Sequence, residues 1–138
     1  MTADRVLELP QAMAEAIIAH ARACHPQEAC GLVAGRGDRA ELLWPGLNAS
    51  ATPEVAFELD LETLSRQLEL EELGLELLAI YHSHPTGPEV PSVLDVKSHH
   101  YPDSYALICS LADGEKPALR AFRLADGAVV EVAVLVVR

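Results

Sequence analysis

The sequence of 138 residues has few cysteines and few aromatic side chains. Its three cysteines are Cys24, Cys30 and Cys109, and no two of them form a Cys-x-x-Cys pair. An odd number of cysteines without such a pair argues against a disulfide framework and suits a reducing compartment. Each of the three stands in an apolar segment, so we interpret them as small buried hydrophobic side chains.

Basic residues are also scarce, since 10 of them face 21 acidic residues and the formal net charge is −11 at pH 7. The lysines and arginines are scattered along the chain. Because the phosphates of nucleic acids are bound by a basic face, we expect no nucleic-acid partner. The excess of carboxylates indicates a solvated surface, with only a weak preference for a positively charged partner.

No hydrophobic run is long enough to span a membrane or to act as a signal peptide. The longest run lies near residues 132–137, and the first residues contain no comparable stretch. We therefore expect a cytoplasmic protein without a membrane partner. Half of the residues are hydrophobic, and the length suits one core, so the sequence predicts a single domain over residues 1–138.

Hydrophobic periodicity and turn signals predict an α/β or α+β fold, a sheet with a helix on each side. A first helix begins at Pro10 and ends before Pro26, and a short third helix covers residues 92–101. The second helix runs from the N-cap Asp60 to Gly74. It carries Leu61, Leu64 and Leu68 on one face. The expected strands cover residues 5–9, 29–34, 40–47, 54–59, 75–81, 105–111, 118–124 and 129–136, with Asp113-Gly114 and Asp126-Gly127 in hairpin turns.

Two histidines and a carboxylate stand on either side of a proline-rich turn. The strand over residues 75–81 leads into His82 and His84, whose side chains share one face because they are two residues apart. Prolines 85, 88 and 91 stiffen the turn, and a helix that begins at Ser92 can carry Asp95 back towards the imidazoles. Two imidazole nitrogens and one carboxylate oxygen leave a fourth tetrahedral position open to water, as catalytic zinc sites do. The stretch therefore predicts a metal site.

Each candidate residue also has an explanation without chemistry. Ser-x-x-Asp before an apolar run is the pattern of a helix N-cap, and taken alone this is the better explanation of Ser92. An isolated histidine at a strand end is more often a surface residue than a ligand. Glu28 precedes a predicted strand, where a carboxylate is common. His99 and His100 could approach the metal behind its ligands, but exposed helix positions explain them better.

The spacing of these residues resembles the signature of the JAMM metalloproteases, the zinc-bearing branch of the Mov34/MPN/PAD-1 family. That signature, His-x-His followed after seven residues by Ser-x-x-Asp, matches residues 82–95 without a gap. Residues 26–35 are similar to the segment that carries the upstream glutamate of the family, and residues 101–111 to the strand after the site in compact prokaryotic members. The resemblance implies a mixed, largely antiparallel sheet flanked by helices, the cytidine-deaminase-like JAMM/MPN core.

The resemblance also implies a zinc-dependent metallopeptidase. Its zinc ligands would be His82, His84 and Asp95, its general base Glu28, and the donor that stabilises the oxyanion Ser92. JAMM enzymes cut the amide bond after the Gly-Gly tail of ubiquitin-like proteins, and similar bacterial members are associated with small sulfur carriers of ubiquitin fold.

The expected partner is therefore a ubiquitin-like or sulfur-carrier protein with a C-terminal Gly-Gly. A tail without side chains can thread a narrow groove, and we expect residues 52–59 to offer it a strand edge.

Two other functional classes stay open. Relatives of this fold that have lost the ligands serve as protein-binding scaffolds, and the intact His82, His84 and Asp95 argue against that class. RadC-like proteins are associated with DNA and share the His-x-His and Ser-x-x-Asp pattern, but the acidic charge argues against them. The valine-rich strand over residues 129–136 could pair between subunits if it lies at an edge, which would give a homodimer.

Overall fold

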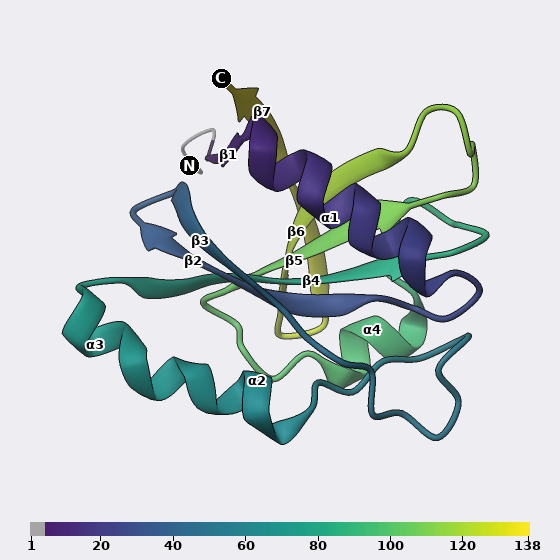
Figure 1. The fold of residues 1–138 in the computed structure, drawn as a ribbon, viewed down its shortest axis with the longest axis horizontal. Coiled ribbons are helices and arrows are strands. Elements are labelled where there is room, and N and C mark those ends of the chain that lie inside the picture. The colour runs from purple at the N-terminus through teal and green to yellow at the C-terminus, as the bar shows by residue number, and fades with distance from the viewer. Residues whose placement is uncertain (1–4) are drawn as a thin grey trace.

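The computed structural model describes residues 5–138, which form a mixed sheet with helices on two sides (Figure 1). A short 3₁₀ turn, Arg66–Glu69, joins the second and third helices. The strands and helices in chain order are β1 (Val6–Pro10), α1 (Gln11–Cys24), β2 (Cys30–Arg36), β3 (Arg39–Pro45), α2 (Leu61–Ser65), α3 (Leu70–Leu73), β4 (Glu76–His84), α4 (Val93–Ser98), β5 (Tyr105–Ser110), β6 (Ala118–Ala125) and β7 (Ala128–Val137).

The sheet has the strand order β1-β3-β2-β4-β5-β6-β7 and closes into a barrel because β1 pairs with both β3 and β7. Within residues 5–138 four pairings are antiparallel (β2–β3, β2–β4, β5–β6, β6–β7) and three are parallel (β4–β5, β1–β7, β1–β3). The mixed, largely antiparallel sheet expected from the sequence is therefore confirmed. Its closure was not expected, and on the β3 side it depends on the single pair Glu8 and Arg39.

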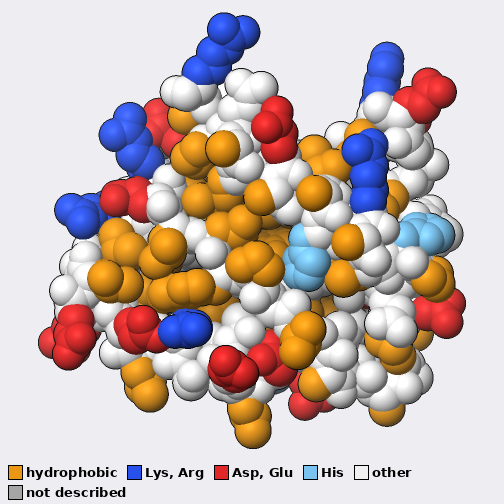
Figure 2. All heavy atoms as spheres, in the orientation of Figure 1, with side chains coloured by type: hydrophobic (Ala, Val, Ile, Leu, Met, Phe, Trp, Pro, Cys, Tyr) orange, Lys and Arg blue, Asp and Glu red, His pale blue; other side chains and the backbone are white. Residues whose placement is uncertain are grey.

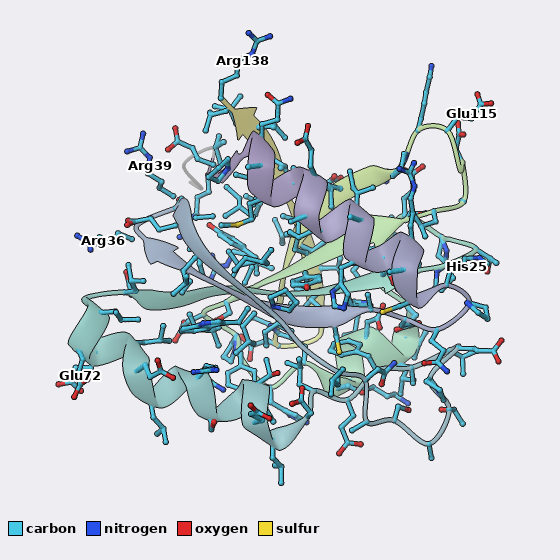
Figure 3. All side chains as sticks on the ribbon, viewed as in Figure 1. His25, Arg36, Arg39, Glu72, Glu115 and Arg138 are labelled. Carbon is cyan, nitrogen blue, oxygen red and sulfur yellow. The ribbon has the colours of Figure 1, made fainter. Side chains whose placement is uncertain are left out.

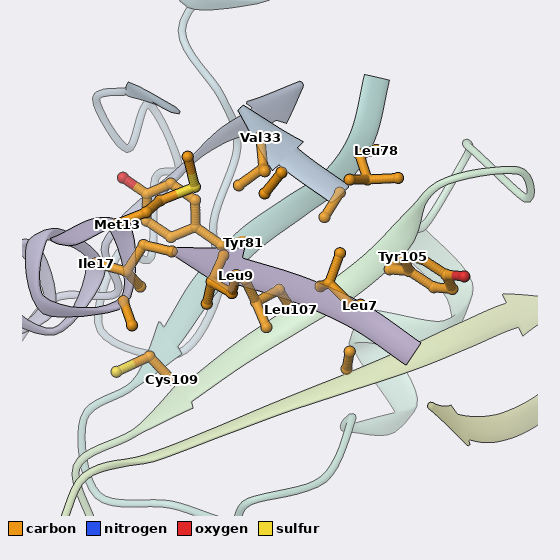
Figure 4. Packing of buried hydrophobic residues seen from close by; sticks show 14 of the residues in the cluster. Leu7, Leu9, Met13, Ile17, Val33, Leu78, Tyr81, Tyr105, Leu107 and Cys109 are labelled. Atoms are coloured by element: carbon orange, nitrogen blue, oxygen red, sulfur yellow. The ribbon is translucent and has the colours of Figure 1, made fainter. Parts of the chain in front are cut away.

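The main hydrophobic core lies between the sheet and α1. One stripe of α1 is buried, because Met13, Ile17 and Ala21 recur at helical spacing and face the strands. In Figure 4, Met13 and Ile17 meet Leu9 of β1 and Tyr81 of β4. The helix ends at Cys24, as expected from the nearby Pro26.

A second, smaller core lies on the opposite face of the sheet, under α2. Strand β4 serves both cores because its side chains alternate, with Tyr81 on the α1 side and Ile80 on the other. Ile80 packs with Leu32 and Leu59. The next residues of β4 on this second side are His82 and His84, so the second core lies directly beside the candidate metal ligands.

The strand expected over residues 54–59 is absent. The carbonyl of Thr52 accepts the N–H groups of Val55 and Ala56, which makes a turn, and the only ladder contact of this segment is the bridge between Asn48 and Leu59 within residues 5–138. The N–H groups of Val55 and Ala56 are used in this local turn, so residues 54–56 do not pair as a strand, and only residues 57–59 stay extended beside Asn48.

The second predicted helix begins at Asp60 and ends at Gly74 as expected. The Asp60 carboxylate accepts the N–H of Thr63, and Gly74 closes the helix with φ of 68°. Its apolar face was predicted wrongly, because Leu61 and Leu68 are 83% and 84% exposed. Leu64, the third residue of that face, packs against the second core as expected. The 3₁₀ turn has about three residues per turn in place of 3.6, so beyond it the pattern is rotated and Leu70 is buried in place of Leu68, whereas Leu61 lies before the turn and its exposure has another origin.

The C-terminal strand β7 is paired along its whole length, but only on one side at a time. Its first half pairs with β6 and its second half with β1, which leaves the other side of each half without a ladder partner among residues 5–138, so the homodimer stays a prediction. The hairpin turn between β6 and β7 is confirmed. Asp126 and Gly127 have φ of 54° and 76°, the conformation of a two-residue type I′ turn.

Charged side chains lie at the periphery. On the face in Figure 2, the Lys and Arg side chains are dispersed among acidic ones and form no basic patch. Arg36, Arg39 and Glu72 extend away from the body of the molecule (Figure 3). None of the helices described has the length and hydrophobicity of a membrane span.

Candidate metal centre

The three candidate ligands converge at one point. His82 and His84 come from the end of β4, and Asp95 comes from the first turn of α4. The Nε2 atoms of the two histidines lie 3.0 Å apart. One carboxylate oxygen of Asp95 lies 3.0 Å from Nε2 of His84, and the other lies 3.2 Å from Nε2 of His82. The structure therefore brings together the three residues that the sequence singled out for a metal.

The proline-rich turn holds His84 in place. Nδ1 of His84 donates a hydrogen bond of 2.6 Å to the carbonyl of Pro88. Gly87 next to it has φ of 92°, and a Cβ at this position would lie 3.0 Å from the side chain of Ala112. A residue with a side chain would be strained there, so glycine suits this bend.

Ser92 is the N-cap of α4, as its sequence pattern predicted. Its Oγ accepts the N–H of Asp95 at 3.0 Å, and its own N–H donates to the Asp95 carboxylate at 2.8 Å. This reciprocal pair is a capping box. The Asp95 carboxylate therefore caps the N-terminus of α4 and also faces the two imidazoles. This cap explains how a helix as short as α4 can hold the carboxylate in position.

The donor set fits a divalent cation. Nδ1 of His84 carries the hydrogen donated to Pro88, so whenever this ring is neutral its Nε2 presents a lone pair to a carboxylate oxygen and to a second imidazole nitrogen. Such a convergence of electron pairs needs a positive charge between them. Two ligands about 2.0–2.1 Å from a tetrahedral zinc lie about 3.3 Å apart. The observed separations are close to this value.

The pKa shifts of Asp95 and His84 show the same preference for positive charge, and that of His82 does not. Burial would raise the pKa of Asp95, but its hydrogen bonds with His82 and His84 hold that pKa far below its usual range. Burial lowers the pKa of His82. For His84 the effect of burial is outweighed by Asp95 and by the Pro88 carbonyl, so its pKa is raised. Asp95 is thus a carboxylate ready to bind a cation.

Glu28 lies beside this group, across the ladder from β4. Cys30 pairs with His82, and Ala29 is bonded to Ser83, so the register places Glu28 next to His84. Its side chain is 5% exposed. Burial raises its pKa to about 7, the charge of His84 opposes this shift and the charge of Asp95 adds to it. Among the residues described, nothing hydrogen-bonds its buried Oε1 atom.

Sequence reasoning missed two residues beside the centre. Phe57 stacks on the imidazole of His82, with ring centroids 4.4 Å apart. The side chain of Asn48 bonds the carbonyl of Glu28 and several backbone groups of the loop that carries Phe57. Both contacts depend on a loop, and loop segments carry no periodic sequence signal. The strand that we expected over residues 54–59 predicts neither of them.

His99 and His100 differ from each other. His99 is half-buried at the end of α4, and its Nε2–H is shared between the carbonyls of Tyr101 at 2.6 Å and Ser104 at 3.1 Å. Its predicted exposure was therefore wrong, and its contacts are structural. His100 is exposed as expected.

An open cavity of about 660 Å³ adjoins the centre, within the size range of ligand sites. His82 and Asp95 lie in its wall, and most of the remaining lining is apolar. The apolar part includes Phe57, Leu59 and Ile80. A bound chain could therefore reach the metal ligands along a hydrophobic wall.

Known proteins are similar to this chain over almost its whole length. A CysO-cysteine peptidase from Mycobacterium tuberculosis is 38% identical over 135 residues, which cover 96% of this chain and 92% of the relative. A probable TtuB-protein conjugate cleaving protease from Thermus thermophilus is 39% identical over 131 residues, covering 94% and 84%. The solution structure of a protein from Desulfitobacterium hafniense matches with a TM-score of 0.84 and 33% identity, covering 96% and 93%. The family model that describes prokaryotic homologs of the JAB domain matches residues 10–125, so the chain belongs to the Prok-JAB family.

Proposed function

We propose that the chain is a zinc-dependent metallopeptidase that hydrolyses the peptide or isopeptide bond after the Gly-Gly tail of a ubiquitin-like or sulfur-carrier protein. The observation that carries the proposal is the convergence of His82, His84 and Asp95 beside the buried carboxyl of Glu28. The names of the mycobacterial and Thermus relatives support the same class of reaction.

Zinc is the metal that this donor set favours. Two imidazoles and one carboxylate with an open fourth position match catalytic zinc sites, whereas magnesium and calcium prefer oxygen ligands. Held by His82, His84 and Asp95, zinc would polarise the scissile carbonyl and lower the pKa of bound water from about 15.7 towards about 7.

Glu28 acts as the general base and then as the general acid. Its carboxylate takes a proton from the attacking water and returns it to the leaving amine. Burial raises the pKa of this carboxyl to about 7 in the metal-free chain, and such a raised pKa suits a group that both takes up and releases a proton.

Ser92 stabilises the oxyanion of the tetrahedral intermediate. Its Oγ accepts the N–H of Asp95 as an N-cap, which leaves the hydroxyl hydrogen for donation to the substrate oxygen. A donor aimed at developing charge can contribute about 3 kcal/mol to the transition state.

The substrate tail binds as a strand along residues 57–59, a shorter edge than the one expected over residues 52–59. The backbone groups of Glu58 point towards Asn48 and Ala49. By the alternation of a strand, the groups of Phe57 and Leu59 point the other way, and both residues line the cavity. Glycines in the tail would let its backbone approach them closely.

The test is to incubate the purified protein with ubiquitin-fold carriers extended past Gly-Gly, with and without a chelator, and to weigh the products. We expect trimming after Gly-Gly that the chelator abolishes, and no trimming by Glu28→Gln although it still binds zinc. Absence of metal-dependent trimming would favour the scaffold class, and salt-sensitive retention on DNA the RadC-like class. A cytoplasmic location and a single domain over residues 1–138 stay predictions.

A further inference from the structure

The orientation of the proposed general base depends on its backbone. Within residues 5–138 its Oε1 atom has no hydrogen-bond partner and its side chain is almost fully buried. A carboxyl without fixed partners can rotate, so it stays aimed at the metal site only if its own peptide units are held firmly.

The peptide groups on both sides of Glu28 are held. Ala29 exchanges hydrogen bonds with Ser83, its N–H donating to the Ser83 Oγ at 2.7 Å and its carbonyl accepting the Ser83 N–H at 2.9 Å. Glu28 itself is held from the other side, because its N–H donates to the Pro53 carbonyl at 2.7 Å and its carbonyl accepts from Asn48 at 3.0 Å. One of these anchors is β4, the strand that carries His82 and His84, and the other is the loop over residues 48–58.

The side chain of Asn48 joins Glu28 to several parts of that loop at once. Its Nδ2 donates to the carbonyls of Glu28 and Ala56 at 3.0 Å and lies 3.3 Å from the carbonyl of Pro53. Its Oδ1 accepts the N–H of Ser50 at 3.0 Å and that of Glu58 at 3.1 Å. An amide side chain has two donor hydrogens and two acceptor lone pairs, so every one of them is used.

The loop that Asn48 shapes also touches a candidate ligand. Phe57, between the bonded residues Ala56 and Glu58, stacks on the imidazole of His82 at 4.4 Å. The side chain of Asn48 is therefore joined to the proposed base on one side and, through Phe57, to the metal site on the other.

We propose that Asn48 is a positioning residue of the hydrolytic site, which sets the backbone of Glu28 and the loop carrying Phe57 in one fixed arrangement. The inference rests on the proposed function of Glu28. No other common side chain supplies two donors and two acceptors at this length, since aspartate cannot donate and glutamine is one methylene longer.

The decisive variant is Asn48→Asp, which keeps the shape and both acceptors but loses both donors. We expect kcat to fall by about 10- to 100-fold, as it does when groups behind a metal site are removed, with one zinc still bound per chain. Ser50→Ala is the matched control, because it removes the hydroxyl bond to the Thr52 N–H in the same loop and leaves Asn48 intact. Its kcat should stay within twofold of the wild type.

A second measurement does not depend on activity. In Asn48→Asp, hydrogen exchange at the amides of Glu28 and residues 50–58 should accelerate at least tenfold, while the amides of β4 keep their protection. Unchanged exchange at Glu28, or an unchanged kcat in the zinc-loaded variant, would overturn the role of Asn48. If the wild-type protein trims no carrier, the proposed function fails and exchange alone decides about Asn48. Should Asn48→Asp not fold, Asn48→Ser takes its place with the same expectations, because one hydroxyl cannot span both anchors.

Discussion

Phe57 lies flat on the imidazole of His82, with ring centroids 4.4 Å apart and an angle of 19° between the planes. This stack orients the ring of His82, because its Nδ1 atom is buried and has no hydrogen-bond partner among residues 5–138. His84 is held differently, through the carbonyl of Pro88. The two candidate ligands therefore depend on different parts of the chain, one on a loop distant in sequence and one on the adjacent turn.

Loss of the stack should weaken metal binding more than it weakens the fold. Aromatic pairs contribute about 0.5–1.5 kcal/mol beyond their buried area, so we expect Phe57→Leu to reduce zinc affinity by about 2- to 10-fold. The measurement is competition with a coloured chelator. Phe57→Tyr, which keeps the ring, should bind zinc as the wild type does. Equal affinities of the leucine and tyrosine variants would contradict a role for the stack.

The two roles of Ser92 should separate by substitution. Ser92→Ala loses the N-cap, so the free energy of unfolding should fall by about 1 kcal/mol. It also loses the proposed oxyanion donor, so kcat should fall by about 10²- to 10³-fold with zinc still bound. Urea unfolding and steady-state kinetics measure the two effects. Ser92→Thr retains a hydroxyl and should recover most of both, and a fully active Ser92→Ala would exclude the catalytic role.

The raised pKa of Glu28 predicts a pH dependence of stability in the metal-free protein. The pKa of a glutamate carboxyl is 4.5 when it is exposed and about 7 for Glu28 in the folded chain, so between these pH values the folded state binds more protons than the unfolded state. The resulting stabilisation is fully present below about pH 4.5 and is lost as pH rises through about 7. Glu28→Gln removes this pH-dependent loss, so between pH 5 and pH 8 its free energy of unfolding should rise by about 2–3 kcal/mol relative to that of the wild type. Urea unfolding at both pH values, with chelator, is the measurement, and a constant difference would contradict the prediction.

Zinc should stabilise the folded chain through Asp95. A ligand that binds only the folded state at 100 times its dissociation constant adds about 2.7 kcal/mol. Thermal unfolding of the wild type should therefore shift upward when zinc is added and return when a chelator is added. In Asp95→Asn the shift should disappear, although the amide oxygen can still accept the Ser92 N–H and retain part of the cap. An undiminished zinc shift in Asp95→Asn would show that the metal binds elsewhere.

Elements with a strong local pattern were predicted well. The amphipathic spacing of α1, the glycine that ends the helix at Gly74 and the Asp126-Gly127 hairpin are all confirmed. The apolar face was wrong at Leu61 and Leu68, which are exposed. For Leu68 the reason is a 3₁₀ turn, which changes the periodicity at a point that no sequence signal marks. The closure of the sheet was missed because β1 pairs with β7 from the other end of the chain. The sequence pattern of a strand does not indicate which other strand it pairs with.

The amino-acid sequence by itself determined the ligand group, because strand alternation, a stiff turn and a helix cap are local effects that act within residues 82–95. Only the tertiary structure decided what surrounds that group. The approach of Glu28 depends on the register between β2 and β4, and the stack of Phe57 depends on a loop shaped by Asn48. Such contacts join residues far apart in the chain, where the energy of pairing and packing, and not local backbone preference, selects the arrangement.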